Sequence, residues 1–291
     1  MDEDGPFDRA LRRLRRDRAA VQAPPGPSLY ASIAEEVLER LDVVRRDFVD
    51  ALVLGSADGC VSESLRRRGL TVTSADAGFR FAAADRGVQC DEDRLPFGPE
   101  RFDLAVFASG LDSVNDLPGA LLLIRRALRP DGLFLAIFPG AGSLPRLRSA
   151  MFAADEAMGG AAPRVHPQID VRAAGDLLGR AGFALPVAES HGVRLRYSDL
   201  FALVRDLRGL GATNILKARS RRPIGRAALA AAALDFASHA EVDGKVPEWL
   251  ELISLTAWAP SPDQPRPARP GSASRSLADA LRPPRRDEPS S

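Results

Sequence analysis

Apolar residues along the chain follow two spacings that predict strands and helices in turn. Short, almost wholly apolar runs predict buried strands at 51–54, 70–75, 87–90, 101–109 and 133–138. Between several of them, apolar residues recur every three or four positions, which predicts helices such as the one over 116–128. Apolar strands that alternate with helices are typical of a parallel sheet covered on both faces. We therefore predict an α/β domain.

Beyond residue 140 the pattern changes to helices with fewer strands between them. Helices are predicted at 143–158, 171–180, 198–207 and 226–240, and extended segments at 183–188, 192–197 and 250–259. From 261 onward Pro, Ser and Arg dominate, which predicts a disordered tail. The predicted organisation is an N-terminal helical extension (1–45), a main domain (46–260) with helical additions within 141–249, and the tail (261–291).

The N-terminal extension begins with a basic helix predicted over 7–22 and continues with a second helix over 29–41. On the first helix, arginines cover most of the surface and the apolar residues fall along one side. These apolar residues are Phe7, Leu11, Leu14 and Val21. Two interpretations stay open for it. It is either a solvated helix laid over the core or a lid, or partner-docking helix, over a bound ligand.

The first predicted strand ends in a turn of small residues, Gly55 to Gly59, that leads into a helix. Small residues let the backbone approach a ligand closely, and the helix N-terminus offers free N–H groups. The segment is therefore typical of the nucleotide-binding turn of a doubly wound fold, although an ordinary tight turn has the same composition.

Two carboxylates follow the next predicted strands. Asp76 ends the second strand about twenty residues after the turn, where a carboxylate can accept hydrogen bonds from ribose hydroxyls. A helix N-cap is the alternative role. Asp91 ends the third strand and could accept a hydrogen bond from an adenine amino group, or belong to a solvated acidic loop.

Composition narrows the function classes. The net charge is +1, from 40 basic and 39 acidic residues, so no global field indicates nucleic acid or a membrane surface as partner. Two cysteines without metal-ligand spacing indicate neither a disulfide framework nor a metal site, and favour a reducing cytoplasm. No apolar run is long enough for a transmembrane helix. Nearly all the positive charge is arginine, which favours a GC-rich bacterial genome.

Several longer motifs resemble one family. The LPF segment at 95–97, the Phe-Asp pair that opens the fourth strand, and SVNDLPGALLLIRRALRPDGLFL resemble the class I S-adenosylmethionine-dependent methyltransferases. FDRALRRLRRDRAA, HPQIDVRAAGDLLGRAGFALP and RYSDLFALVRDLRGLGATN resemble the subgroup that holds the respiratory complex I assembly factor 5 (arginine hydroxylase) proteins and the biotin-pathway malonyl-carrier-protein methyltransferases. The resemblance extends to Pro260, so 141–249 would carry the branch-specific parts.

The resemblance implies a fold and a cofactor. The expected fold is a Rossmann-like seven-stranded sheet whose last strand, over 250–259, is antiparallel and inserted between its neighbours. The expected cofactor is S-adenosylmethionine, without a metal. The implied contacts are Gly55, Ser56, Ala57, Gly59, Asp76, Asp91, Glu92 and Ala108, with Ser109 beside the last of them. LPF and VNDLP argue against a dinucleotide-dependent oxidoreductase.

The sequence departs from the family's pattern at the turn. Val53 stands where the family has an acidic residue, Ala57 replaces the middle glycine, and Asp58 adds a negative charge. Asp112 and Ser113 replace an aromatic or histidine pair. These changes could weaken cofactor binding, so a non-enzymatic assembly or chaperone protein with a degenerate site is the competing hypothesis.

Methyl transfer requires the protein mainly to position the reactants and to exclude water from them. The sequence therefore identifies no catalytic residue. His166 could act as a general base, although capping of the next helix through Asp170 is the simpler role for that loop. Tyr197, Arg208 and Asn214 lie in the branch-specific region and could shape the acceptor side. Arginine hydroxylation is also implied by the resemblance, but the sequence shows no spacing typical of an oxidation centre.

The function predicted from the sequence is that of a cytoplasmic, bacterial, S-adenosylmethionine-dependent methyltransferase. The resemblance implies an acceptor on a protein or carrier protein, such as a subunit of respiratory complex I. Neither nucleic acid nor a transmembrane segment is expected.

Overall fold

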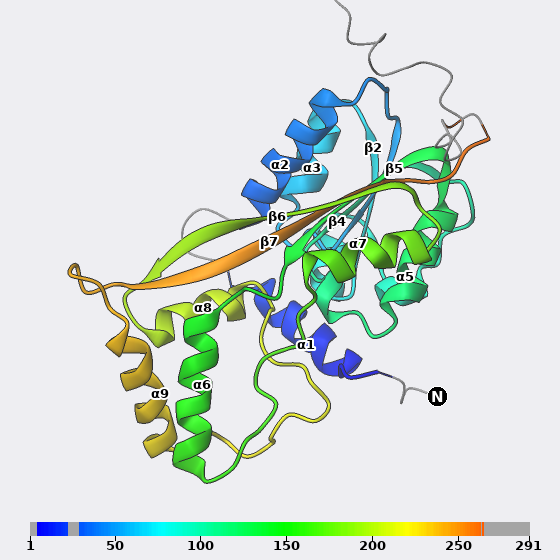
Figure 1. The fold of residues 1–291 in the computed structure, drawn as a ribbon. Coiled ribbons are helices and arrows are strands. Elements are labelled where there is room, and N and C mark those ends of the chain that lie inside the picture. Colours follow the sequence, from blue (N-terminus) through cyan, green and yellow to red (C-terminus); the bar gives the residue numbers. More distant parts are fainter. Residues whose placement is uncertain (1–4, 23–28, 263, 265–291) are drawn as a thin grey trace, which may run out of the picture. The chain divides into compact units, whose positions relative to one another are not determined.

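The structure is a computed structural model that describes residues 5–22, 29–262 and 264 (Figure 1). Met1–Pro260 form one compact unit, to which the description below refers. The predicted disordered tail lies almost entirely outside the described residues.

A seven-stranded sheet forms the centre of this unit, with strand order β3-β2-β1-β4-β5-β7-β6. The strands are β1 (Asp50–Leu54), β2 (Thr71–Asp76), β3 (Val88–Gln89), β4 (Phe102–Ala108), β5 (Leu128–Pro139), β6 (Ala184–Tyr197) and β7 (Val246–Trp258). Strands β1 to β5 pair in parallel, and β7 runs antiparallel between β5 and β6. The α/β fold and the inserted last strand that the family resemblance implied are confirmed.

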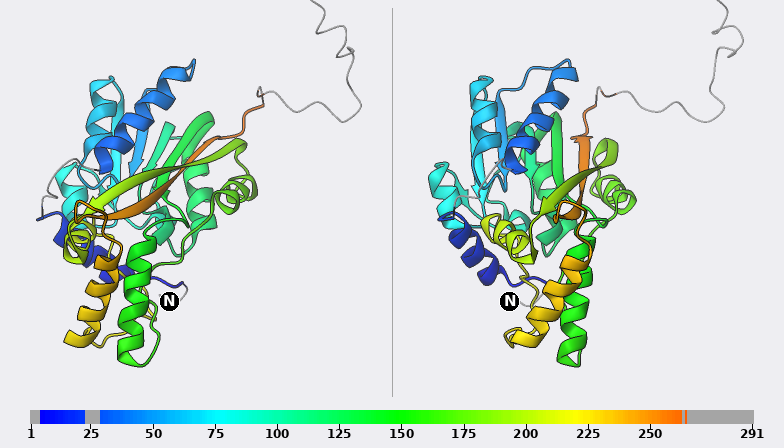
Figure 2. Two further views of the ribbon diagram at one scale, coloured as in Figure 1. Left: turned by 60° about the vertical axis from the view of Figure 1, so that its left-hand side comes forward. Right: turned by 90° about the vertical axis from the view of Figure 1, so that its left-hand side faces the viewer.

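Helices cover both faces of the sheet (Figures 1 and 2). They are α1 (Arg9–Ala19), α2 (Leu29–Val43), α3 (Cys60–Arg67), α4 (Phe79–Ala84), α5 (Leu117–Ala127), α6 (Pro145–Met158), α7 (Val171–Arg180), α8 (Leu200–Gly209) and α9 (Arg226–Ser238). Two short 3-10 helices, Glu92–Arg94 and Leu111–Ser113, follow β3 and β4.

Alternation along the strands decides which helices each side chain meets. In β1, Ala51 and Val53 pack with α2 and α3, whereas Leu52 and Leu54 pack in the cluster with α5 and α7. Because both faces are covered, β4 is buried along its whole length, which explains its unbroken apolar sequence.

Strands β6 and β7 form a long antiparallel ribbon, and α6 and α9 pack together near its far end (Figure 2). The prediction of two extended segments at 183–188 and 192–197 was wrong, since a single strand spans both. A Cβ atom at Gly192 would lie 1.6 Å from Trp249 Cζ2, so the glycine leaves room for this ring. Helix α4 was also missed, because six residues are too few to show a helical period.

The strand register brings three loops to the same edge of the sheet. Leu54, the last residue of β1, is level with Ala75 of β2 and Phe107 of β4. The segments that follow these strands therefore begin side by side at the carboxyl edge of the parallel strands, where open α/β sheets bind ligands.

Candidate cofactor-binding site

The turn after β1 depends on glycine at its first position. Gly55 has φ +74°, and a Cβ atom there would lie 2.6 Å from the carbonyl oxygen of Ser109. Ala57 is buried without a positive φ, so its methyl group adds no backbone strain. The Asp58 carboxylate accepts the N–H of Cys60, the first residue of α3, at 3.0 Å. The two departures from the family pattern therefore fit the local backbone.

The end of β4, opposite this turn, is conformationally strained. Ser109 has φ +78° and Gly110 has φ +93°. A non-glycine residue in this region costs about 1–3 kcal/mol, and such strain clusters at functional sites. The side chain of Ser109 also hydrogen-bonds to Tyr30 of α2, which ties the second N-terminal helix to the same edge.

The three predicted carboxylates lie buried at this edge, with exposed fractions of 5% for Asp76 and 2% for both Asp91 and Glu92. Asp76 Oδ1 accepts the N–H of Gly78 at 2.7 Å, but Gly78 rather than Asp76 is the N-cap residue of α4. Buried carboxylates require donors, because an unpaired charge is costly away from water.

Arginines of α1 supply those donors. Arg16 Nε and Nη2 contact Asp76 Oδ1 and Oδ2 at 2.7 and 2.5 Å, and Arg12 contacts both oxygens of Glu92 at 2.5 and 2.7 Å. Arg13 Nη2 contacts Asp91 Oδ2 at 2.5 Å. We call the four arginines Arg9, Arg12, Arg13 and Arg16 the arginine clasp.

Arg9 completes the clasp through Asp93, whose two oxygens lie 2.5 and 2.6 Å from Arg9 Nη1 and Nη2. The predicted orientation of α1 was therefore wrong. Its arginines at positions 9, 12, 13 and 16 face the protein, whereas Leu14 and Val21 are 46% and 67% exposed. A cluster of carboxylates determines this orientation more strongly than a sparse apolar stripe does.

Arg12 and Arg16 are buried together with their partners. Burial alone would lower the pKa of the Arg16 guanidinium, but the charge and hydrogen bonds of Asp76 outweigh it and raise that pKa. The guanidinium groups therefore stay charged, and four positive groups neutralise four carboxylates at this edge.

Two buried polar atoms fit an adenosine-containing ligand. Within the part of the chain that the structure describes, Asp91 Oδ1 and Ser56 Oγ have no hydrogen-bond partner. A free carboxylate oxygen suits an adenine amino group, and a hydroxyl in the glycine turn suits a polar group that passes over it. The residues thus fit S-adenosylmethionine, except that both oxygens of Asp76 are hydrogen-bonded to Arg16.

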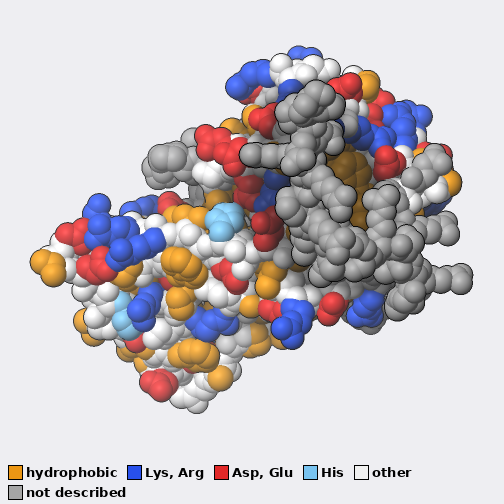
Figure 3. Space-filling view, turned by 45° about the horizontal axis from the view of Figure 1, so that its top comes forward, with side chains coloured by type: hydrophobic (Ala, Val, Ile, Leu, Met, Phe, Trp, Pro, Cys, Tyr) orange, Lys and Arg blue, Asp and Glu red, His pale blue; other side chains and the backbone are white. Residues whose placement is uncertain are grey.

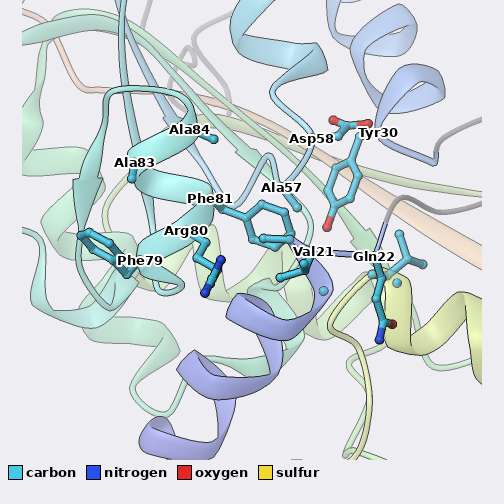
Figure 4. Close-up of a pocket in the computed structure, with 14 residues that line it drawn as sticks. Val21, Gln22, Tyr30, Ala57, Asp58, Phe79, Arg80, Phe81, Ala83 and Ala84 are labelled. Carbon is cyan, nitrogen blue, oxygen red and sulfur yellow. The ribbon is translucent and has the colours of Figure 1, made fainter.

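A cavity of about 860 Å³ opens beside the glycine turn (Figure 4). Tyr30 of α2 and Phe81 of α4 flank Ala57 in it, and the end of α1 forms another wall. Asp76, Asp91 and Glu92 do not line this cavity. The structure therefore separates an open space at the turn from the carboxylates covered by α1.

Two further ionisable groups lie near the edge. Burial raises the pKa of the Asp112 carboxyl to about 6, although its own backbone N–H and Arg12 oppose the shift. Burial, followed by the charges of Glu92 and Asp91, raises the pKa of the Cys90 thiol to about 12. Cys90 is therefore not a thiolate nucleophile at neutral pH.

His166 has a structural role. Its Nε2 accepts the N–H of Ile215 at 3.0 Å, and its ring lies 5.2 Å from the ring of Phe7 in an edge-on arrangement. Burial, then the charges of Arg15 and Arg12, lower the pKa of His166 to about 4. In the same loop Asp170 caps α7 through the N–H of Ala173, as its alternative role predicted.

This environment predicts a pH-dependent stability. Unfolded chains protonate His166 near pH 6.5, whereas the folded chain resists until about pH 4, so stability falls as the pH falls between these values. We expect His166→Gln, measured by urea unfolding from pH 7 to pH 5, to reduce this dependence by up to about 1.4 kcal/mol per pH unit. His191→Gln on exposed β6 is the matched control, and equal pH profiles for wild type and His166→Gln would contradict the assignment.

The three residues predicted to shape the acceptor side do not come together. Tyr197 lines a cavity of about 690 Å³ between α2 and the β6–β7 ribbon. Asn214 donates to the carbonyl of Pro163 at 2.8 Å and accepts from Leu216, so it braces a loop. Arg208 is exposed in the last turn of α8.

The face drawn in Figure 3 carries acidic and basic side chains interspersed rather than in one-signed patches. Among the described residues, no group of three or more His, Cys, Asp or Glu side chains could hold a metal ion. Within the described part of the chain, no helix is both long enough and apolar enough to span a membrane.

Several known proteins are similar to this chain in sequence. A methyltransferase domain family matches residues 52–136. The arginine-hydroxylase NDUFAF5, mitochondrial, of Danio rerio is 33% identical over 94% of this chain and 88% of its own length. The malonyl-[acyl-carrier protein] O-methyltransferase of Methylovorus sp. is 32% identical over 87% of this chain and 90% of its own.

Solved structures agree on the fold. The YcgJ protein of Bacillus subtilis has a TM-score of 0.54 at 12% identity, over 79% of this chain and 99% of its own. Phosphoethanolamine N-methyltransferase 2 of Haemonchus contortus, in complex with S-adenosylhomocysteine, has a TM-score of 0.50 at 15% identity, over 82% and 54%. Because the sheet order and the relatives agree, the chain belongs to the class I S-adenosylmethionine-dependent methyltransferase family, in the subgroup of NDUFAF5 and the malonyl-carrier-protein methyltransferases.

Proposed function

We propose that the chain binds S-adenosylmethionine at the carboxyl edge and transfers its methyl group to an acceptor carried by a protein. The observation that supports this most is that three buried carboxylates lie at the edge of the sheet where the glycine turn begins, and that among the described residues one oxygen of Asp91 has no hydrogen-bond partner. The bound cofactor would supply an electrophilic methyl group. The chain's own residues would position it and exclude water.

Each predicted contact has a role in this proposal. Asp76 would accept the ribose hydroxyls, and Asp91 with Glu92 would hold the adenine. The turn residues Gly55, Ser56, Ala57 and Gly59 would let the cofactor pass close to the backbone, and Ala108 would border it at the end of β4.

Calorimetric titration with S-adenosylmethionine tests the cofactor. We expect micromolar binding that Asp76→Ala abolishes and Asp91→Asn weakens. The second variant matters because Asp91 pairs with Arg13, whose side chain is 44% exposed, so folding depends less on that pair. The matched control is Asp42→Ala, which removes an exposed carboxylate paired with Arg68. Undetectable binding at millimolar ligand, both for wild type and for variants in which arginines of the clasp are replaced by glutamine, would overturn the proposal.

The acceptor is proposed from the relatives. The malonyl-[acyl-carrier protein] O-methyltransferases indicate a carrier-bound acceptor, and the NDUFAF5 relatives, which are named arginine hydroxylases, indicate an arginine side chain. We propose a protein-borne acceptor, with a subunit of respiratory complex I as the first candidate and the bacterial cytoplasm as the location.

Arginine hydroxylation is the second candidate, favoured by the 33% identity to NDUFAF5 over 94% of the chain. Capture of partners from the native host followed by mass spectrometry separates the two activities. A captured protein that gains the mass of a methyl group only when the chain and S-adenosylmethionine are present supports transfer. A gain of one oxygen supports hydroxylation, and no gain supports the non-enzymatic assembly role.

A further inference from the structure

We propose that α1 is a built-in competitor for the adenosine half of the cofactor site. The arginine clasp and S-adenosylmethionine would bind the carboxylates in a mutually exclusive way. The cofactor would therefore bind only after the arginines dissociate from the carboxylates. This inference rests on the proposed function and concerns the regulation of that site.

The clasp matches the carboxylates residue by residue. Arg9, Arg12, Arg13 and Arg16 have the spacing i, i+3, i+4, i+7, which places them on one face of the helix. They meet two short stretches of sequence, Asp76 and the acidic run 91–93. Three of the four pairs involve two nitrogens and two oxygens, the geometry of strong arginine–carboxylate recognition.

Both oxygens of Asp76 already accept hydrogen bonds from Arg16. Oδ1 accepts from Arg16 Nε and from the N–H of Gly78, and Oδ2 accepts from Arg16 Nη2. Helix α1 also lies directly on this loop, because a Cβ atom at Gly78 would lie 2.7 Å from Arg16 Cβ. A ribose that hydrogen-bonds to Asp76 therefore needs the space that the Arg16 side chain fills.

The clasp also removes the charge that would attract the ligand. S-adenosylmethionine carries a sulfonium and an ammonium group against one carboxylate, so its net charge is positive. With the clasp docked, the four carboxylates are neutralised. With α1 lifted, the edge would present four negative charges to a cationic ligand.

The start of α1 is held independently of the clasp, which would allow the helix to swing without leaving. Phe7 is buried, its N–H donates to Asn115 Oδ1 at 2.8 Å, and its carbonyl accepts from Asn115 Nδ2 at 3.1 Å. Phe7 also forms a β-bridge with Leu216. The clasp would therefore stay close to its carboxylates after release and could dock again.

Titration of clasp variants with S-adenosylmethionine tests the competition. If the open form is a minor population, removing the clasp raises the apparent affinity, and we expect Arg12→Gln/Arg16→Gln to bind about tenfold tighter than wild type. Arg9→Gln/Arg13→Gln, which changes the more exposed pair, should shift affinity in the same direction if the first variant folds poorly. Arg18→Gln is the control, since Arg18 is an exposed arginine of the same helix.

Hydrogen exchange of wild-type α1 gives a second readout. A competitor should exchange faster when S-adenosylmethionine is added, whereas a lid that closes over the ligand should exchange more slowly. Equal or weaker binding by both clasp variants, or slower exchange, would overturn the clasp and leave the proposed function standing. No binding by wild type and by every variant would overturn both.

Discussion

Replacing Asp76 by alanine is expected to lower the free energy of unfolding by about 3–5 kcal/mol, because it leaves a buried guanidinium without its counter-charge. Arg16 is 6% exposed and directs three contacts to Asp76 and to the carbonyl of Gly55. Arginine does not lose its proton at neutral pH, so Arg16 keeps its positive charge when Asp76 is removed. Urea unfolding of the variant and of wild type at neutral pH measures the difference.

The double variant Arg16→Met/Asp76→Leu separates an unpaired charge from loss of packing. Replacing both partners of a buried ion pair by apolar side chains of similar size is often neutral. We therefore expect the double variant to unfold close to wild type. If it loses as much stability as the single variant, the pair itself, rather than the stranded charge, is what stabilises this edge.

Gly55→Ala is expected to cost about 3 kcal/mol of unfolding free energy, by adding left-handed strain to a steric conflict with the backbone. The new methyl group would lie 2.6 Å from the Ser109 carbonyl oxygen and 3.3 Å from that of Ala108. Neither is the movable end of a side chain, so β1 and β4 would have to separate at the edge where the cofactor is proposed to bind. Thermal and urea unfolding of the purified variant test this.

Gly59→Ala provides the matched control, because Gly59 has φ +73° but, among the described residues other than its chain neighbours, no atom lies within 4 Å of the added methyl group. We expect it to cost about 1 kcal/mol from strain alone. Equal losses for the two variants would mean that conformation, and not the close approach to Ser109, accounts for the need for glycine at Gly55.

Local patterns predicted the central strands β1, β4 and β5 well, because these strands are largely buried on both faces and their apolar runs are unambiguous. They failed where a distant partner decides the outcome. The orientation of α1 depends on carboxylates 60 to 84 residues away, which no helical period reveals. The continuity of β6 follows its pairing with β7, in which Gly192 leaves room for the ring of Trp249.

The candidate site was predictable in its acidic half. Asp76 and Asp91 follow neighbouring parallel strands, so the fold class alone places them at one edge. The sequence does contain one indication of the clasp, namely four arginines at the spacing of one helix face. Pairing them with an acidic cluster requires the tertiary position of α1. The strain at Ser109 likewise has no sequence signature, since serine is not a residue that marks a positive φ.

The helices at the far end of the β6–β7 ribbon have a core of their own. Among the described residues, the buried cluster around Leu147, Leu203 and Phe236 has no member in common with the two clusters on the sheet faces. Substitutions in well-separated cores change stability almost additively. Substitutions in this helical module and substitutions at the edge with the carboxylates should therefore have additive effects on stability, so the module can change in sequence without altering the contacts that hold that edge together.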